Sequence, residues 1–131
     1  MDEKAGKTPG EIKFRLDNKY LKEEETTYKS ELLIDKAKKL LEEGNVNEAI
    51  LCLEAEVQGR KYGTVGWRML GGLYRENYQN NYAYIALNSA HTSDPYDLKT
   101  LMLLGILCVS EQAESEALLY FTDWLKYNKK Y

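Results

Sequence analysis

The chain has 131 residues, of which 44% are hydrophobic and 30% are charged, so it fits one compact domain or a short array of repeats. Its formal net charge of -3 at pH 7 argues against nucleic-acid binding, which needs a concentrated basic surface. No apolar run reaches the roughly 18 residues of a membrane helix, and the polar start, Met1 to Gly10, has no signal-peptide pattern. Cys52 and Cys108 match no metal or redox spacing, so we expect a reducing, cytosolic compartment.

Residues 1–29 are predicted to form an N-terminal extension that is partly flexible. The acidic run Glu23-Glu24-Glu25 suggests a metal or a basic partner, but the solvated face of a leading helix is the better interpretation. From Ser30 onward, apolar residues recur at helical spacing and β signals are scarce. The rest of the chain is therefore predicted to be nearly all α-helical.

The helical part repeats itself at a constant interval, with small or apolar residues at matching places. The matched sets are Ala49, Ala83 and Ala117; Leu53, Leu87 and Phe121; Leu33, Trp67 and Leu101; Ala37, Gly71 and Gly105; and Leu40, Tyr74 and Cys108. This spacing predicts three units of equal length, at 30–63, 64–97 and 98–131. Each unit offers two helices joined by a polar turn, such as Gly44-Asn45-Val46-Asn47.

The middle unit resembles the tetratricopeptide repeat (TPR). Its first helix reads W-R-M-L-G-G-L-Y, and its second half carries the pattern residues Ala83, Leu87, Ala90 and Pro95. The resemblance implies that Gly71 and Ala83 let the two helices of one hairpin approach closely. Trp67, Leu70 and Tyr74 would fill the space between hairpins, so this stripe is interpreted as repeat core and not as a cofactor site. The predicted fold is an all-α TPR superhelix of three repeats.

One TPR family resembles the chain in particular: the cytosolic receptor for the C-terminal (type-1) peroxisomal targeting signal. The third unit ends in D-W-L-K-Y, and the family has a D-W-L-x-Y ending there. The stretches A-I-L-C-L-E-A-E-V-Q (49–58) and I-A-L-N-S-A-H-T-S-D-P (85–95) resemble its first and second repeats. Glu76-Asn77 matches the family's E-N pair, and Phe14, Asn18 and Tyr20 resemble its leading segment F-x-x-x-N-P-Y, with Lys19 in place of Pro.

The flanking units depart from the repeat pattern. Glu56 and Lys61 stand where a small residue and a proline are usual, and Cys108 and Trp124 replace the usual Tyr and Ala. The family receptor has seven repeats, so the chain is expected to be a fragment that holds the first half of the array. Its last helix is expected to expose an apolar stripe that contacts the remaining repeats or supports self-association. The stripe consists of Leu118, Phe121, Trp124 and Leu125.

Binding, and not catalysis, is the chemistry that the residues favour. The single histidine, His91, is interpreted as exposed or partly packed, and no Gly-rich phosphate cradle is present, so we expect no enzyme activity, metal or cofactor. In a TPR superhelix the first helix of each pair lines a concave groove. The candidate peptide-binding residues there are Lys99, Met102, Ile106, Val109, Ser110, Glu111, Arg75 and Glu76. Further groove positions are Glu31, Ile34, Lys38, Leu41 and Glu42 in the first unit and Val65, Arg68 and Gly72 in the second.

The apolar strip on the third unit has two interpretations. It could receive an aliphatic side chain of a ligand, or pack against a fourth repeat. The resemblance implies a C-terminal Ser-Lys-Leu-type peptide of cargo proteins as ligand, and a receptor that cycles between cytoplasm and peroxisomal membrane. The family's V-x-x-T-N-E stands here as Ile106, Val109, Ser110 and Glu111, so a threonine hydroxyl and an asparagine amide are lost. A single lost hydrogen bond is worth about 0.5–1.5 kcal/mol. Glu111 could face the lysine of the ligand.

The alternative is a TPR co-chaperone or scaffold adaptor that binds another C-terminal peptide. A clamp for an acidic peptide requires Lys and Asn along the first helices of the repeats. Ile34, Met69 and Leu103 stand at comparable places in this chain, which favours the targeting-signal receptor. Neither function involves nucleic acid or direct membrane insertion.

Overall fold

The computed structural model describes residues 11–21, 27–60 and 63–128. The described chain consists of a short 3-10 helix, η1 (Lys19–Leu21), and the α-helices α1 (Thr27–Glu42), α2 (Val46–Gly59), α3 (Thr64–Glu76), α4 (Asn80–Ser93), α5 (Leu98–Ser110) and α6 (Glu114–Tyr127). These ranges contain no strand, which confirms the all-α prediction. The leading helix predicted around Glu23-Glu24-Glu25 and the departure at Lys61 lie outside the described residues.

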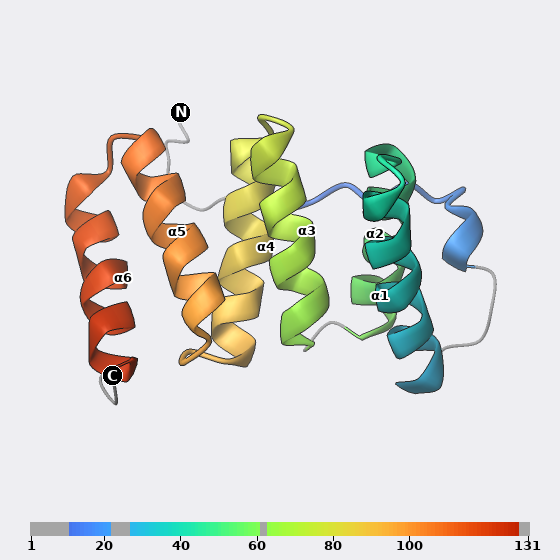
Figure 1. Ribbon diagram of the computed structural model, residues 1–131. Coiled ribbons are helices and arrows are strands. Elements are labelled where there is room, and N and C mark those ends of the chain that lie inside the picture. Colours follow the sequence, from blue (N-terminus) through green and yellow to red (C-terminus); the bar gives the residue numbers. More distant parts are fainter. Residues whose placement is uncertain (1–10, 22–26, 61–62, 129–131) are drawn as a thin grey trace.

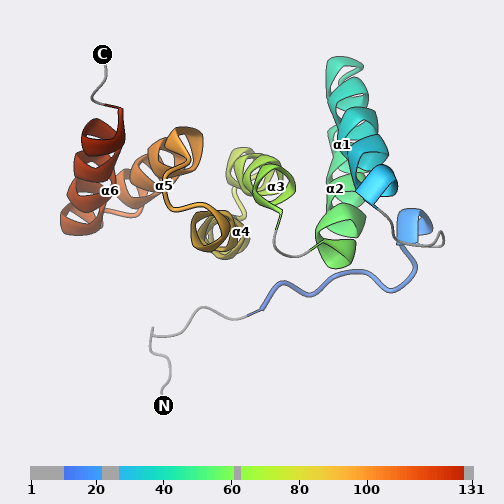
Figure 2. The same ribbon diagram turned by 90° about the horizontal axis from the view of Figure 1, so that it is seen from below.

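The α-helices pack as three neighbouring hairpins, α1–α2, α3–α4 and α5–α6 (Figure 1). Each hairpin is joined to the next mainly through contacts of α2 with α3 and of α4 with α5. Figure 2 shows the same row of hairpins from below. This is the organisation of a repeat array, in which stability comes from each unit and from the interfaces with its neighbours.

The turn inside each hairpin has the same backbone geometry. Gly44 (φ 81°), Tyr78 (φ 61°) and Gln112 (φ 60°) lie in the left-handed region, at equivalent positions of the three units. In each turn the next N–H donates to a carbonyl of the preceding helix at 2.8 Å: Asn45 to Leu40, Gln79 to Tyr74 and Ala113 to Cys108. These bonds satisfy carbonyls that the helix end would leave unpaired.

Tyr78→Gly should stabilise the protein. Tyr78 is 92% exposed, so its side chain contributes little packing, while its β-carbon strains the left-handed backbone by about 1–2 kcal/mol. Glycine removes that strain but adds unfolded-chain entropy worth about 0.4–1 kcal/mol. We expect a net gain of about 0.5–1 kcal/mol in urea unfolding. Tyr78→Ala keeps the β-carbon and should show no such gain; equal effects of the two variants would contradict this account.

Small residues allow the helices of a hairpin to touch. A β-carbon on Gly71 would lie 2.6 Å from Leu87 Cγ, well inside van der Waals contact, and one on Gly105 would overlap the ring of Phe121. The prediction that Gly71 permits close approach is therefore confirmed. Ala83, its predicted counterpart on α4, is fully buried.

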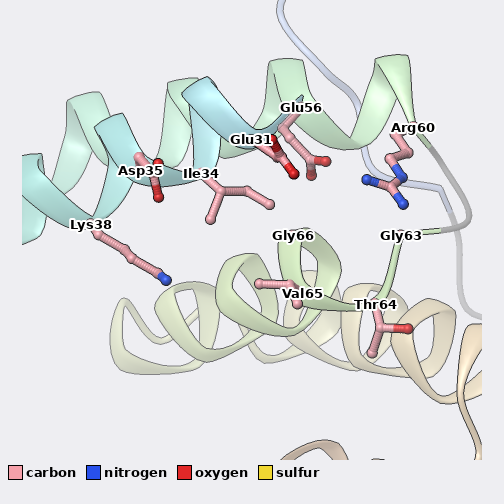
Figure 3. A pocket seen from close by; sticks show the side chains of 10 residues that line it. All are labelled: Glu31, Ile34, Asp35, Lys38, Glu56, Arg60, Gly63, Thr64, Val65 and Gly66. Atoms are coloured by element: carbon pink, nitrogen blue, oxygen red, sulfur yellow. The ribbon is translucent and has the colours of Figure 1, made fainter. Parts of the chain in front are cut away.

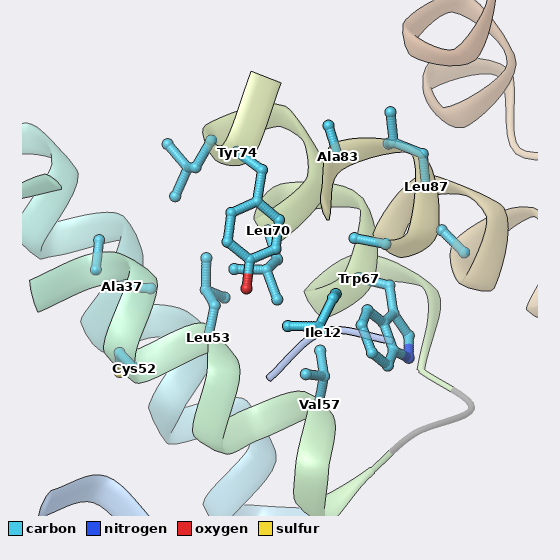
Figure 4. Packing of buried hydrophobic residues seen from close by; sticks show 14 of the residues in the cluster. Ile12, Ala37, Cys52, Leu53, Val57, Trp67, Leu70, Tyr74, Ala83 and Leu87 are labelled. Carbon is cyan, nitrogen blue, oxygen red and sulfur yellow. The ribbon is translucent and has the colours of Figure 1, made fainter. Parts of the chain in front are cut away.

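The aromatic stripe of α3 is core. Leu70 and Tyr74 are 0% and 1% exposed and Trp67 is 8% exposed, and all three lie in the central apolar cluster drawn in Figure 4. Gly72 differs from its neighbour Gly71, because a β-carbon there would meet only Leu103 Cδ1, at 3.9 Å. The interpretation of the stripe as packing is confirmed, and Gly72 lies on a less crowded face of α3, called the open face below.

The described part of the N-terminal extension lies along α2 and reaches α4 (Figure 2). Ile12 is buried in the central apolar cluster. Asn18 is also buried, and its side-chain amide donates to the carbonyl of Leu51 on α2 at 2.8 Å. The Lys13 N–H donates to the hydroxyl of Tyr82 on α4 at 3.2 Å. This segment therefore joins the first two hairpins.

Candidate functional site

The predicted peptide-binding residues of the third unit lie on α5 and at its end, with their apolar members facing solvent. Val109 is 52% exposed and Ile106 is 37% exposed, and Met102 is half-buried. Lys99 and Ser110 are exposed on the same helix. The strip is thus accessible in the described chain. Both a ligand side chain and a fourth repeat would need such an accessible surface.

The open face of α3 lies beside this strip. Helices α3 and α5 contact each other, and Gly72 leaves the facing surface of α3 without a side chain opposite Leu103. Arg75, one turn further along α3, is half-buried, and among the described residues its buried Nε has no hydrogen-bond acceptor. Glu76 is exposed beside it. An unpaired buried donor is available to a carbonyl or carboxylate of a ligand.

Two polar candidates already have partners within the chain. The Ser110 hydroxyl donates to the Leu107 carbonyl at 2.8 Å, so it is bonded to its own helix. The Asn80 side-chain amide, at the start of α4, donates to Glu111 Oε2 at 2.5 Å. Glu111 is thereby oriented, and its carboxylate keeps further acceptor sites free. No sequence signal indicated this contact, which joins two different hairpins.

An ion pair that the sequence analysis missed connects the second and third hairpins. Arg68 Nη1 lies 2.9 Å from Asp97 Oδ2, and both side chains are largely buried. Asp97 also caps α5, accepting from the Thr100 N–H at 3.2 Å and from the Thr100 hydroxyl at 2.6 Å. The D-x-x-T spacing before an apolar run was the available signal for this cap.

The electrostatics of this contact favour a charged Asp97. Burial raises the pKa of Asp97, but the hydrogen bonds from Thr100 and Arg68 and the charge of Arg68 outweigh it, so the pKa is lowered below 3.8. Asp97 is therefore ionised at neutral pH. Arg68, which the sequence placed on the concave face, is held at the interface between hairpins.

A cleft of about 470 Å³ lies between α1 and α3, at the junction of the first two hairpins (Figure 3). It is lined by Glu31, Ile34, Asp35, Lys38, Glu56, Arg60, Gly63, Thr64, Val65 and Gly66. Glu31, Ile34, Lys38 and Val65 were expected to face the groove, and the structure brings them together here. Arg75 and Glu76 of α3 and the candidate peptide-binding residues of the third unit are not among the lining residues, so the cleft lies apart from them.

The side chains with catalytic potential are packed. Cys52 and Cys108 are free and buried, and burial raises the pKa of Cys52 to about 11, so this thiol stays protonated. His91 is half-buried, with its ring edge-to-face against Tyr120 at 5.9 Å. Within the described ranges, no group of His, Cys, Asp and Glu could hold a metal ion, and no helix is long and apolar enough to cross a membrane.

Comparison with solved structures defines the class of protein. The first TPR of Spaghetti (RPAP3), solved with an HSP90 peptide, matches with a TM-score of 0.76 at 20% identity, covering 82% of this chain and 85% of that one. MamA matches with a TM-score of 0.72 at 17% identity, covering 77% and 59%. The stacked hairpins and these matches establish a TPR fold.

Sequence comparison identifies the relatives within that class. The chain is 37% identical over 92 residues to peroxisome biogenesis protein 5 of Arabidopsis thaliana, which covers 70% of this chain. It is 30% identical over 93 residues to the PEX5-related protein of Mus musculus, which covers 71% of this chain. The chain spans only 13% and 16% of the length of these two relatives, and no family model matches it. The chain is a TPR protein homologous to a segment of the peroxisome biogenesis protein 5 family, which confirms the resemblance.

Proposed function

We propose that the chain is a peptide-recognition module that forms the first half of a cargo-binding repeat array, and that it performs no catalysis. Its ligand is the C-terminal targeting peptide of cargo proteins, of the Ser-Lys-Leu kind. The observation that carries the proposal is the solvent-facing strip of Ile106 and Val109 beside the open face at Gly72. The homology to peroxisome biogenesis protein 5 supports it, and with it a location in the cytoplasm with cycling to the peroxisomal membrane.

In this proposal the ligand lies extended between α3 and α5. Met102, Ile106 and Val109 contact an aliphatic side chain, whose full burial would contribute about 1.5–3 kcal/mol. The free Nε of Arg75 donates to a carbonyl or carboxylate oxygen of the peptide, which adds about 1.5–3 kcal/mol for a charged donor. Glu111, held by Asn80, receives the cationic side chain of the ligand, while Lys99 and Glu76 border the groove.

The isolated chain should bind such a peptide weakly. Ser110 bonds to its own helix, and the three described hairpins are too few to surround a ligand. We expect a dissociation constant no tighter than roughly 100 µM, about -5.5 kcal/mol. Fluorescence anisotropy with a labelled peptide ending in Ser-Lys-Leu measures the dissociation constant. Changes in the NMR signals of α5 show where the peptide binds.

Ile106→Asp should abolish this binding, because it places a charge where the aliphatic side chain docks. Leu16→Asp introduces a charge at a leucine of the N-terminal extension that is 97% exposed, and should have no effect. Low-micromolar affinity would contradict the expected weakness. Absence of any shift on α5 at millimolar peptide would contradict the proposed function, and preference for an acidic peptide such as SRMEEVD would favour the adaptor alternative.

We also propose that the outer face of α6 mediates association. Leu118, Leu119 and Leu125 are each 66% exposed, whereas Phe121 is half-buried against Gly105. The sequence assigned Phe121 and Trp124 to the open stripe; both are half-buried, Phe121 because Gly105 leaves room for its ring. The remaining apolar face could be covered by further repeats of a longer receptor, and in the isolated chain by a second copy.

Sedimentation velocity at rising concentration should show a monomer–dimer equilibrium in the high-micromolar range. Burial of apolar surface favours association by about 25 cal/mol per Å² before entropic costs. The double variant Leu118→Lys, Leu125→Lys should remain monomeric. A strict monomer of the unmodified chain at several hundred micromolar, where any association is weaker than about -5 kcal/mol, would overturn this proposal.

A further inference from the structure

The N-terminal segment 11–18, here called the strap, is held to the helices at only a few described points. The Asn18 amide bonds to α2, and the Lys13 N–H donates to the hydroxyl of Tyr82 on α4. Between these two anchors the strap turns towards solvent, and Leu16 is 97% exposed. The strap therefore bridges the first two hairpins through few contacts, with exposed chain between them.

The strap runs antiparallel to α2 in a regular register. Asn18 bonds to the carbonyl of Leu51. Glu54 follows Leu51 by three residues, which places it on the same face of α2. The charge that acts on Glu54 from the strap is that of Arg15, which precedes Asn18 by three residues. Glu54 therefore lies beneath the middle of the strap.

Ile12 continues this register at the far end of the strap. It precedes Arg15 by three residues, and it is buried in the apolar cluster that contains Val57, which follows Glu54 by three. Figure 4 draws Ile12 among buried side chains of this cluster, including Val57 and Tyr74. The strap is thus anchored on both sides of Glu54.

The carboxyl group of Glu54 is enclosed and has no directly paired cation among the described residues. Glu54 is 8% exposed, and its Oε2 accepts from the Tyr74 hydroxyl of α3 at 2.5 Å. The ring of Tyr82, whose hydroxyl anchors the strap, lies edge-to-face on Tyr74 at 5.3 Å between centroids. Arg15 is exposed, and its guanidinium pairs with Asp17 at 3.1 Å. The covered carboxyl group is therefore linked to the strap from two sides.

These surroundings favour the protonated form of Glu54. Burying a carboxylate without a paired cation is costly, whereas a neutral carboxyl group can be buried with a hydrogen bond. Burial accordingly raises the pKa of Glu54 above its ordinary value of 4.5, and this effect outweighs the hydrogen bond from Tyr74 and the charge of Arg15.

We propose that the strap is a pH-sensitive device, which closes over Glu54 when the carboxyl group is protonated and opens when it is ionised. Opening admits water to the carboxylate and so removes the cost of burying its charge. Because the closed state has the higher pKa, protonation of Glu54 stabilises closure fully below about pH 4.5. This contribution is lost as pH rises through the pKa of the closed state.

The test is amide hydrogen exchange of the full chain, followed by ¹H–¹⁵N NMR between about pH 4 and about pH 8. The Lys13 N–H is bonded to Tyr82 only while the strap is closed, so its protection factor reports closure. This factor, corrected for the intrinsic exchange rate at each pH, should fall at least about threefold as pH rises, which corresponds to about half a pKa unit. The amide of Leu104, buried in α5, reports global unfolding and should not follow the same course.

Variants on the strap and on α2 assign the effect to Glu54. Glu54→Gln keeps an acceptor for the Tyr74 hydroxyl but carries no charge, and should make the Lys13 protection factor independent of pH. Glu48→Gln, the same change at a carboxylate of α2 whose pKa is lowered, should retain the fall. Arg15→Gln should enlarge the fall, because the guanidinium favours ionised Glu54 in the closed state. A constant protection factor in the unmodified chain, or an equal fall in Glu54→Gln, would overturn the inference.

Discussion

Gly71→Ala should destabilise the protein by about 1–3 kcal/mol, although alanine is the better helix former. Its β-carbon would lie 2.6 Å from Leu87 Cγ and 3.2 Å from the Leu87 backbone nitrogen, so α3 and α4 must separate. Helix propensity alone would give a gain of about 1 kcal/mol, and the steric overlap must exceed it. Thermal melts followed by circular dichroism should show a midpoint lowered by several degrees. Gly71→Leu adds bulk at the same contact and should unfold the middle hairpin.

Gly72→Ala is the matched control, one residue further along the same helix. Only Leu103 Cδ1 lies within 4 Å of its new β-carbon, at 3.9 Å, so the propensity gain is unopposed and the protein should be stabilised by up to about 1 kcal/mol. Lys99→Ala, at an exposed position, should leave the midpoint nearly unchanged. If the two glycine variants shift the midpoint in the same direction, the close approach of α3 and α4 is not what Gly71 provides.

The repeat spacing made the fold predictable because small residues are needed wherever two helices touch. Ala37, Gly71 and Gly105 occupy the same position in successive units, and a β-carbon on either glycine would overlap the partner helix. The turns share a backbone conformation but not a residue type. Tyr78 and Gln112 occupy the left-handed position that Gly44 occupies in the first unit. Pattern therefore predicted the helices and their pairing, whereas the left-handed turn residues were not recognisable by residue type.

The candidate site was only partly predictable, because its decisive contacts join distant positions. Glu56 was recognised as a departure from the pattern, but the room that Gly66 leaves for its carboxylate depends on the packing of α2 against α3. The hydrogen bond from the Asn80 amide to Glu111 likewise joins residues of two different hairpins. Periodicity assigns a residue to a helix face; it does not say which neighbour that face meets or where the helices leave a cleft.

Interfaces between hairpins contribute much of the stability of a linear array. The ion pair of Arg68 and Asp97 is part of the interface between the second and third hairpins. Asp97→Ala removes the cap of α5 and leaves Arg68 without its carboxylate partner. We expect a loss of about 2–3 kcal/mol at pH 7, from the cap and from the charged hydrogen bonds together. Asp97→Asn keeps a capping oxygen and should lose less. Urea unfolding monitored by circular dichroism measures both variants.

The loss caused by Asp97→Asn should depend on pH in a defined direction. The pKa of Asp97 is lowered in the folded state, so ionised Asp97 stabilises the fold above its unfolded pKa near 3.8, and this contribution disappears as pH falls through the lower folded pKa. The difference in unfolding free energy between the unmodified chain and Asp97→Asn should therefore be constant from pH 7 to about pH 5 and shrink at lower pH. Arg68→Met, which keeps the aliphatic stem, should reduce the same difference at pH 7 in a double-mutant cycle. A difference that stays the same down to about pH 2.5, or that Arg68→Met leaves unchanged, would mean that Asp97 acts only as a neutral cap and that the ion pair does not couple the second hairpin to the third.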